Sequence, residues 1–189
     1  NSMINIKNII NNISNKKISV IGAGISGQGA SNLANYLGAK VLLSTDKKQP
    51  NIKLISDKIN IEFSHSNKCL NSDLAITSPG IDPDKSSILK KIKKSNLPLI
   101  SEVEFGFWFS KAPIIAVTGS NGKSTVVKIL NDIFKHKYNT VLLGGNIGKS
   151  FCMNVIEELE SNEKSIIHIL ELSSFQLQEI IKFKPALAC

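Results

Sequence analysis

Glycine, lysine and hydroxyl side chains lie together in residues 117–125, whose sequence is VTGSNGKST. The run follows a β-branched apolar segment and precedes a segment with helical spacing of apolar residues, which is the setting of a phosphate-binding loop. Glycines let the backbone turn tightly, and N–H groups at the start of a helix then point at an anion. We expect nucleotide phosphates to be bound by Gly119, Ser120, Asn121, Gly122, Lys123, Ser124 and Thr125.

Three side chains near this loop are suited to phosphoryl chemistry. Lys123 can reach the outer phosphates as a point charge, and the hydroxyl of Ser124 can ligate Mg²⁺. Glu171 directly follows an apolar segment that reads as a buried strand, and ligands gather at the carboxyl ends of parallel strands. The loop is shorter than the usual G-x-x-x-x-G-K-[ST] pattern, because Val117 stands where its first glycine would be. We expect Lys123 and Glu171 to be catalytic, and Ser124 and Glu171 to bind the metal ion.

A second glycine-rich loop, residues 22–27 with the sequence GAGISG, lies near the N-terminus. It matches the G-x-G-x-x-G fingerprint between a strand and a helix, and Asp46 lies 24 residues after Gly22. Taken alone, the loop indicates NAD(P) or FAD, although any nucleotide diphosphate could use the same helix N-terminus. Gly80 lies in a Pro-Gly corner after another apolar segment and could approach the same ligand.

Both loops need strands and helices that bring them to the edge of a sheet. Short β-branched runs alternate with amphipathic segments, which predicts an α/β fold with mainly parallel sheets. Strands are expected at Lys17–Ile21, Lys40–Ser44, 59–63, Leu74–Thr77, 97–101, 113–117, 141–143 and 165–170, and a further one begins near 186. Helices are expected at 26–37, 84–95, Glu102–Phe109, Lys123–Phe134, 151–159 and 175–181. A new strand–loop–helix unit after residue 110 predicts two domains: a Rossmann-like domain with a parallel sheet in residues 1–110, and a truncated P-loop α/β domain in 111–189.

Composition excludes several classes of protein. Apolar residues make up 42% and charged residues 20% of the chain, which rules out wholesale disorder. All 23 basic residues are lysine and the net charge is +8, but sequence-specific nucleic-acid binding relies on arginine, so we expect no nucleic-acid partner. There is no apolar run long enough for a membrane helix and no secretory signal. Three widely spaced cysteines suggest no disulfide framework, so the cytoplasm is the expected compartment.

The pairing of a Rossmann-like loop with a separate P-loop resembles the Mur ligase family, and the resemblance covers nearly the whole chain. The stretches that carry it are residues 22–27, 78–81, 119–125, 144–148 and 171–177. The last stretch, ELSSFQL, is the most specific, and it resembles the branch of the family that uses D-glutamate. The resemblance implies three domains, which bind a UDP-sugar, ATP and the incoming amino acid. We therefore expect this chain to hold the first domain and part of the second, with the family's later His and carbamylated Lys after Cys189.

The resemblance also implies an activity and its ligands. Such a ligase joins D-glutamate to UDP-N-acetylmuramoyl-L-alanine through an acyl phosphate, with ATP and Mg²⁺ as cofactors. It acts on small molecules as a monomer, without a membrane. Three alternatives stay open: a non-catalytic fragment that binds UDP-sugar, a sister ligase or folylpolyglutamate ligase, and a nicotinamide-dependent dehydrogenase.

The same resemblance assigns residues to the UDP-sugar. In the glycine loop they are Gly24, Ile25, Ser26 and Gly27, and in the corner after the fourth strand Gly80 joins them. The family places an acid and a hydroxyl after the second strand, and residues 44–47 can be registered in two ways, of which we favour Asp46 with Thr45 beside it. Asn146 is expected to contact the muramoyl part of the substrate near the reacting end. His168, in an apolar strand, is expected to be a packed core residue.

Overall fold

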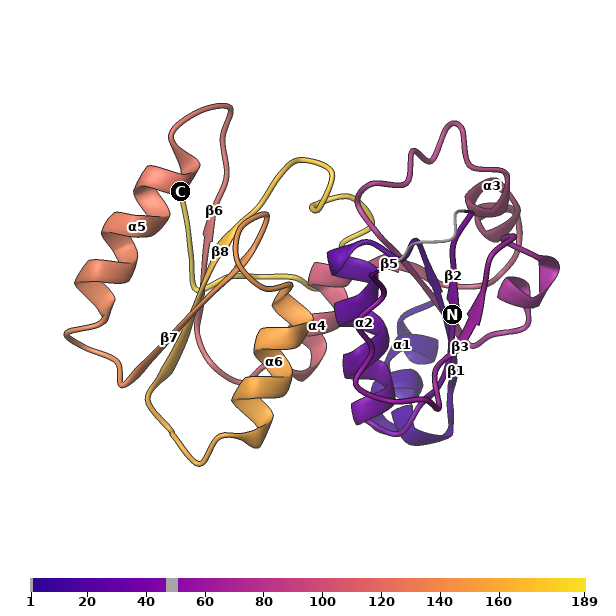
Figure 1. Cartoon of the computed structure of the whole chain (residues 1–189), viewed down its shortest axis with the longest axis horizontal. Coiled ribbons are helices and arrows are strands. Elements are labelled where there is room, and N and C mark those ends of the chain that lie inside the picture. The colour runs from indigo at the N-terminus through magenta and orange to yellow at the C-terminus, as the bar shows by residue number, and fades with distance from the viewer. Residues whose placement is uncertain (1, 47–50) are drawn as a thin grey trace.

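The computed structural model describes residues 2–46 and 51–189 and contains two parallel sheets side by side (Figure 1). The first sheet has the strand order β3-β2-β1-β4-β5. Its strands are β1 (Lys17–Ile21), β2 (Lys40–Ser44), β3 (Asn60–Glu62), β4 (Leu74–Thr77) and β5 (Leu99–Ser101). The helices of this half are α1 (Ser2–Asn11), α2 (Ile25–Tyr36), α3 (Ser87–Lys94) and α4 (Glu102–Phe109).

The second sheet has the strand order β7-β8-β6-β9. Its strands are β6 (Ile114–Val117), β7 (Thr140–Gly145), β8 (Ile166–Glu171) and β9 (Leu187–Ala188), and its helices are α5 (Lys123–Phe134) and α6 (Phe151–Glu160). All pairs in both sheets are parallel, so the expected fold class is confirmed. None of the helices among residues 2–46 and 51–189 is long and apolar enough to cross a membrane.

Three helices fill the space between the two sheets. In Figure 1, α2, α4 and α6 lie in the middle of the molecule, and one cluster of buried apolar residues extends from the first sheet to the second. The helices approach closely: a Cβ atom on Gly29 would lie 1.8 Å from Ser150 Oγ, and one on Gly106 would lie 2.7 Å from the ring of Phe151. Such close contacts need glycine, and they hold the two halves together by packing.

The prediction of a helix at residues 175–181 is wrong, because this segment forms turns. Its apolar spacing is helical, but its backbone groups bond to the first half of the chain instead. The carboxylate of Glu104 on α4 is fully buried and accepts hydrogen bonds from the backbone N–H groups of Ile181, Lys182 and Phe183, at 2.8–2.9 Å, and from Nε1 of Trp108 at 2.6 Å. A buried carboxylate needs such donors, so this long-range requirement overrides the local pattern.

Helix α1 was not expected, because residues 1–17 are rich in Asn and Lys. It forms because Ile6 and Ile9 are three residues apart on one face, and both are buried. The short 3₁₀ turn Ile13–Asn15 then adds buried Ile13 to the same core before β1 begins.

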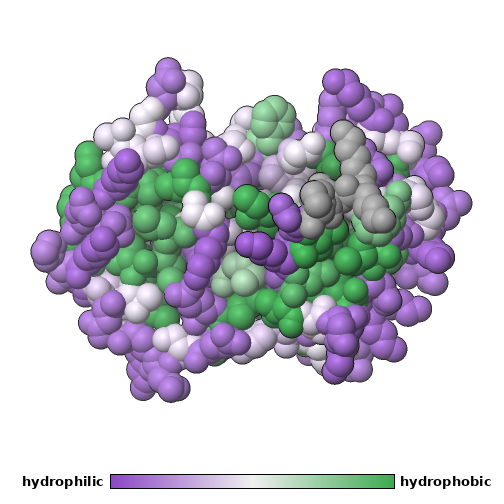
Figure 2. All heavy atoms as spheres, in the orientation of Figure 1, coloured by the Kyte–Doolittle hydropathy of each residue, from purple (hydrophilic) through white to green (hydrophobic). Residues whose placement is uncertain are grey.

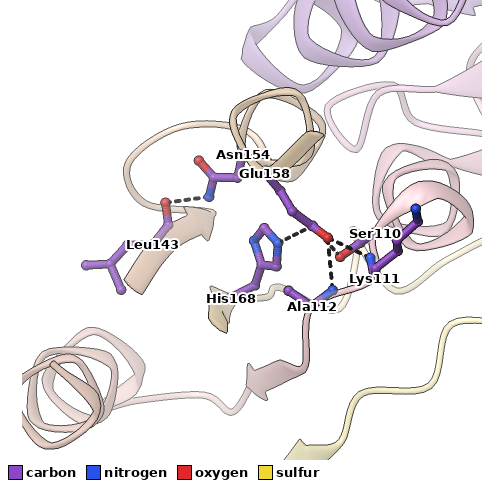
Figure 3. A network of polar contacts seen from close by, with 7 residues as sticks. All are labelled: Ser110, Lys111, Ala112, Leu143, Asn154, Glu158 and His168. Carbon is purple, nitrogen blue, oxygen red and sulfur yellow. Dashed lines mark hydrogen bonds and ion pairs between the residues drawn. The ribbon is translucent and has the colours of Figure 1, made fainter. Parts of the chain in front are cut away.

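Glu158 on α6 fixes the connection between the two sheets (Figure 3). Its carboxylate accepts hydrogen bonds from Ser110 Oγ at 2.8 Å and from the backbone N–H groups of Lys111 and Ala112 at 2.7 and 2.9 Å. It also pairs with Nε2 of His168 at 2.7 Å. Burial works to raise the pKa of Glu158, but the hydrogen bonds from His168, Lys111 and Ser110 outweigh it and hold the pKa below its usual value. The expectation that His168 is a core residue is confirmed, since its side chain is fully buried.

Candidate functional site

The loop between β6 and α5 is open to solvent at the start of the helix. Gly119 and Gly122 have φ angles of +139° and +78°, a region that favours glycine. A Cβ atom on Gly122 would meet nothing within 4 Å. Glycine is therefore needed at 122 for the backbone conformation, while the space in front of the helix N-terminus stays open. This is the geometry that lets backbone N–H groups approach a phosphate.

The side chain of Lys123 folds back over this loop. Its Nζ donates a hydrogen bond to the carbonyl oxygen of Gly119 at 2.7 Å. The residue is half-buried, and a lysine of this reach can exchange a carbonyl oxygen for a phosphate oxygen by rotation of its side chain. The loop therefore carries a positive charge that can turn from this carbonyl toward a bound phosphate.

Ser124, Glu171 and Asn146 meet beside the loop. The hydroxyl of Ser124 donates to Oε2 of Glu171 at 2.6 Å, and Nδ2 of Asn146 donates to Oε1 at 3.3 Å. The sheet register explains the meeting, because Glu171 pairs with Val117 of β6 and with Gly145 of β7, so all three strands end together. Glu171 is only 3% exposed, which keeps its carboxylate aimed along the edge of the sheet.

The side-chain oxygens of Ser124 and Glu171 are suitable ligands for Mg²⁺. A hydroxyl and a carboxylate oxygen lie next to each other, and Mg²⁺ in nucleotide sites takes one or two such ligands together with phosphate oxygens and water. Within the part of the chain that the structure describes, no group of three or more His, Cys, Asp or Glu side chains forms a cage for a metal ion. The residues present therefore suit a metal ion that arrives with a nucleotide.

The glycine loop of the first sheet is packed against its own neighbours. A Cβ atom on Gly27 would lie 1.8 Å from the carbonyl oxygen of Gly22, and one on Gly22 would lie 2.9 Å from Cβ of Ser78. The loop therefore rests on the corner that contains Gly80, as close backbone approach requires. Gly24 and Ile25 are exposed at its tip, and Ser26 is half-buried beside them.

A cavity of about 440 Å³ lies at the carboxyl end of the same sheet. Asp46 and Gly80, both exposed, line it together with His65 and Lys85. Thr45 is buried next to Asp46, and Lys47, the last residue of the stretch 44–47, lies outside the described residues. The sequence reasoning did not find His65 or Lys85. The one local sign at His65 is a positive φ of 43°, which only the structure reveals.

The chain resembles known proteins along nearly its whole length. Residues 117–188 match the family described as Mur ligase middle domain. Proteins named UDP-N-acetylmuramoylalanine–D-glutamate ligase are similar to it: 40% identical in Christiangramia forsetii, 39% in Bacteroides thetaiotaomicron and 36% in Thermoanaerobacter pseudethanolicus. Each of these matches covers 92% of this chain and 39% of the relative, so the chain spans about 39% of the length of these relatives.

A solved structure supports the fold. The murein peptide ligase mpl from Psychrobacter arcticus matches with a TM-score of 0.58 and 17% identity, over 92% of this chain and 42% of that one. At this identity the likeness concerns the fold alone, and it agrees with the two parallel sheets described above. The comparisons thus show that residues 117–188 match the Mur ligase middle domain, and that 92% of the chain is similar to the ligases named above.

Proposed function

We propose that this chain provides two parts of an ATP-dependent ligase that joins D-glutamate to UDP-N-acetylmuramoyl-L-alanine, in the synthesis of peptidoglycan precursors in the cytoplasm. Residues 1–110 are the UDP-sugar-binding domain, and residues 111–189 are the first part of the ATP-binding domain. The observation that carries the proposal is the meeting of an open glycine loop, Lys123 and the Ser124–Glu171 pair at one sheet edge. The names of the relatives support the choice of substrates.

The loop residues position the nucleotide. Backbone N–H groups of residues 119–125 bind the phosphates, and Lys123 leaves the carbonyl of Gly119 to contact the outer phosphate. Bound ATP supplies the phosphoryl group that activates the terminal carboxylate of the muramoyl substrate as an acyl phosphate, with ADP as the leaving group. The amine of D-glutamate then attacks the acyl carbon, the amide bond forms and inorganic phosphate leaves. Because phosphoryl transfer needs placement and charge stabilisation above all, one fixed lysine and a preorganised loop account for a large part of the catalysis.

Ser124 and Glu171 are the proposed Mg²⁺ ligands. Glu171 would hold the metal ion after Ser124 and Asn146 turn away from its carboxylate, which both can do because their donor atoms belong to side chains. Asn146 is then free to bond the muramoyl substrate near the reacting carboxylate. The groups that are hydrogen-bonded to one another here are thus the ones that would contact metal and substrate.

The first sheet holds the uridine diphosphate. Gly24, Ile25, Ser26 and Gly27 present the helix N-terminus of α2 to the diphosphate, as in other loops of this type. Thr45, Asp46 and Gly80 lie at the same sheet edge, around the 440 Å³ cavity. In Figure 1 the loop after β4 and the loop after β6 both lie at the top of the molecule. One substrate can therefore extend from the first sheet to the second.

A second candidate function is binding without turnover. The chain spans about 39% of the length of its relatives, and the resemblance to the family implies that a later part of such a ligase binds the incoming amino acid. On this view the 189 residues bind the UDP-sugar and ATP, and transfer no phosphoryl group until the remaining domains are present.

A hybrid protein separates the two candidates. We expect residues 1–189, continued by the remainder of the Christiangramia forsetii relative, to release phosphate from ATP only when UDP-N-acetylmuramoyl-L-alanine and D-glutamate are both added. The 189-residue chain alone should bind both nucleotides but release no phosphate from ATP. Replacement of D-glutamate by L-lysine or glycine is the matched substrate control. A hybrid that prefers another amino acid, while the unmodified relative uses D-glutamate, contradicts the proposal.

A further inference from the structure

His65 lies in an unusual position at the edge of the first sheet. It follows β3, lines the 440 Å³ cavity beside Asp46, and is half-buried. Its φ of 43° lies in the left-handed region, which is uncommon for residues other than glycine. Non-glycine residues in this region cluster at binding sites, where the surrounding structure holds them in place. The hydrogen bonds around His65 show what holds it.

Ser44, the last residue of β2, links the imidazole to a carboxylate. Its hydroxyl donates to Oε1 of Glu62 at 2.8 Å, and its Oγ lies 2.9 Å from Nδ1 of His65. Glu62 also accepts hydrogen bonds from the backbone N–H and hydroxyl of Ser66 and from the thiol of Cys69. Burial works to raise the pKa of Glu62, but the hydrogen bonds from Ser66, Ser44 and Cys69 outweigh it and lower the pKa. The side chain of Glu62 is therefore ionised, and an ionised carboxylate can accept hydrogen bonds but cannot donate one.

This chain of bonds fixes the proton on the imidazole. A serine hydroxyl has one hydrogen, and Ser44 gives it to Glu62. The oxygen of Ser44 must then accept from Nδ1–H of His65, so the neutral ring carries its proton on Nδ1 and a lone pair on Nε2. Among residues 2–46 and 51–189, Nε2 of His65 has no hydrogen-bond partner. The ring therefore offers one acceptor to whatever occupies the cavity.

We propose that His65 recognises the base of the bound uridine nucleotide, with Nε2 accepting a hydrogen bond from the N3–H group of uracil. The proposal rests on the proposed binding of a UDP-sugar at this sheet edge. Asp46, also at the cavity, is left for the ribose hydroxyls, as is usual for an acid after the second strand of such sheets. Cytosine carries a lone pair at N3, so it would face the lone pair of Nε2. By fixing the proton on Nδ1 of the imidazole, the hydrogen bonds of Glu62, Ser44 and His65 thus make the site prefer uridine over cytidine nucleotides.

Nitrogen-15 NMR of the imidazole tests the proton position in the 189-residue chain without any ligand. At about pH 8.5, where imidazoles are ordinarily neutral, we expect the long-range ¹H–¹⁵N spectrum of His65 to show the proton on Nδ1. In the Ser44→Ala variant the ring should return to the Nε2–H form, which is common in solution. His136 is the internal reference, because it is exposed on the turn after α5. A wild-type ring with its proton on Nε2 overturns the proposal.

Binding of UDP and CDP to the same chain tests the recognition. We expect the wild type to bind UDP at least about tenfold more tightly than CDP, and His65→Phe to lose about tenfold in UDP affinity and most of the discrimination. His136→Phe is the matched control and should leave both affinities unchanged. His65→Asn, which tolerates a positive φ, replaces the phenylalanine variant if that one does not fold. Equal UDP affinity in wild type and His65 variants overturns this inference alone, whereas a wild type that binds no UDP also overturns the UDP-sugar site.

Discussion

Two glutamates of the second half have largely buried side chains, one with a structural role and one with a proposed functional role. Glu158 lies at the amino end of the second sheet and Glu171 at its carboxyl end. Glu158 accepts from two backbone N–H groups, at Lys111 and Ala112, besides two side chains. Within residues 2–46 and 51–189, the hydrogen bonds to the carboxylate of Glu171 come from side chains alone.

The difference concerns which donors can move. A backbone N–H cannot leave an acceptor unless the chain itself moves, so Glu158 is bound to the connection between the sheets as a fixed part of the scaffold. A hydroxyl or an amide can turn away by rotation about one or two bonds, so Glu171 can exchange its partners for a metal ion. Backbone donors on a buried acid therefore indicate structure, and side-chain donors at an open sheet edge indicate a site.

The largest expected effect is on stability, for Glu158→Ala. The change removes the acceptor of the fully buried ring of His168 and of two less buried backbone N–H groups, so the free energy of unfolding should fall by about 4 kcal/mol. Urea denaturation followed by the fluorescence of Trp108, the single tryptophan, measures it. Glu160→Ala, at an exposed position of the same helix, is the control and should change stability little. If Glu171→Ala destabilises the chain as much as Glu158→Ala, the comparison fails.

Glu102 is an intermediate case and predicts a pH dependence. One of its oxygens accepts from the backbone N–H of Cys152 at 2.7 Å, and among the described residues the other is buried without a partner. Burial raises the pKa of Glu102 to about 7, although the hydrogen bonds from Cys152 oppose it. The folded state then holds a proton that the unfolded chain releases near 4.5, so stability should fall as the pH rises from 4.5 through 7, by about 3 kcal/mol in total.

Denaturation of wild type and Glu102→Gln at pH 5 and pH 8 checks this sign. The glutamine cannot ionise, so the variant should be the more stable of the two at pH 8 and should change little between the two conditions. Glu158 does not mask the effect, because its pKa is lowered and its contribution is lost only as the pH falls below 4.5. A wild type that gains stability between pH 5 and pH 8 contradicts the prediction.

Local patterns predicted the elements that local forces determine. Strands such as Lys17–Ile21 and the helix Lys123–Phe134 were expected at their observed bounds, because β-branched runs and helical spacing agree there with the burial that the fold imposes. The glycine-rich turn between β6 and α5 could equally be predicted, since the positive φ angles of Gly119 and Gly122 favour glycine. The grouping of Ser124 with Glu171 followed from the rule that parallel strands end at one edge.

Long-range polar contacts explain what was missed. Residues 175–181 have a helical pattern, but the segment is fixed by contacts with the first half, including a backbone bond from Ser101 to the carbonyl of Glu179. The Glu62–Ser44–His65 chain joins residues about 20 positions apart, which no spacing rule connects.

The apolar residues Val126, Ile129 and Ile133 of α5 fit a helical stripe yet are exposed, and Figure 2 shows hydrophobic surface at the α5 end of the molecule.

A smaller effect is expected for binding at the movable site. Lys123→Ala removes one charged hydrogen-bond donor to a phosphate, so the affinity of the chain for ATP should fall by about tenfold to a hundredfold, with unchanged stability. Titration with ATP followed by calorimetry measures it. Lys128→Ala removes an equal charge from an exposed position of α5 and controls for long-range attraction. Equal losses in both variants would mean that overall charge, and not the loop, binds the phosphates.

The smallest expected effect is at Gly122, and it tests whether the open loop is fixed by its own backbone. A Cβ atom there meets no neighbour within 4 Å, so Gly122→Ala is disfavoured only by the φ of +78° and should lower the free energy of unfolding by about 1 kcal/mol. Gly80→Ala is the matched control, because its surroundings are as open and its φ is not positive, so stability should stay within about 0.5 kcal/mol. Urea denaturation of both variants gives the difference. If the two alanines have the same effect, the loop relaxes freely, and its phosphate-binding shape is then formed by the ligand and not by the glycine.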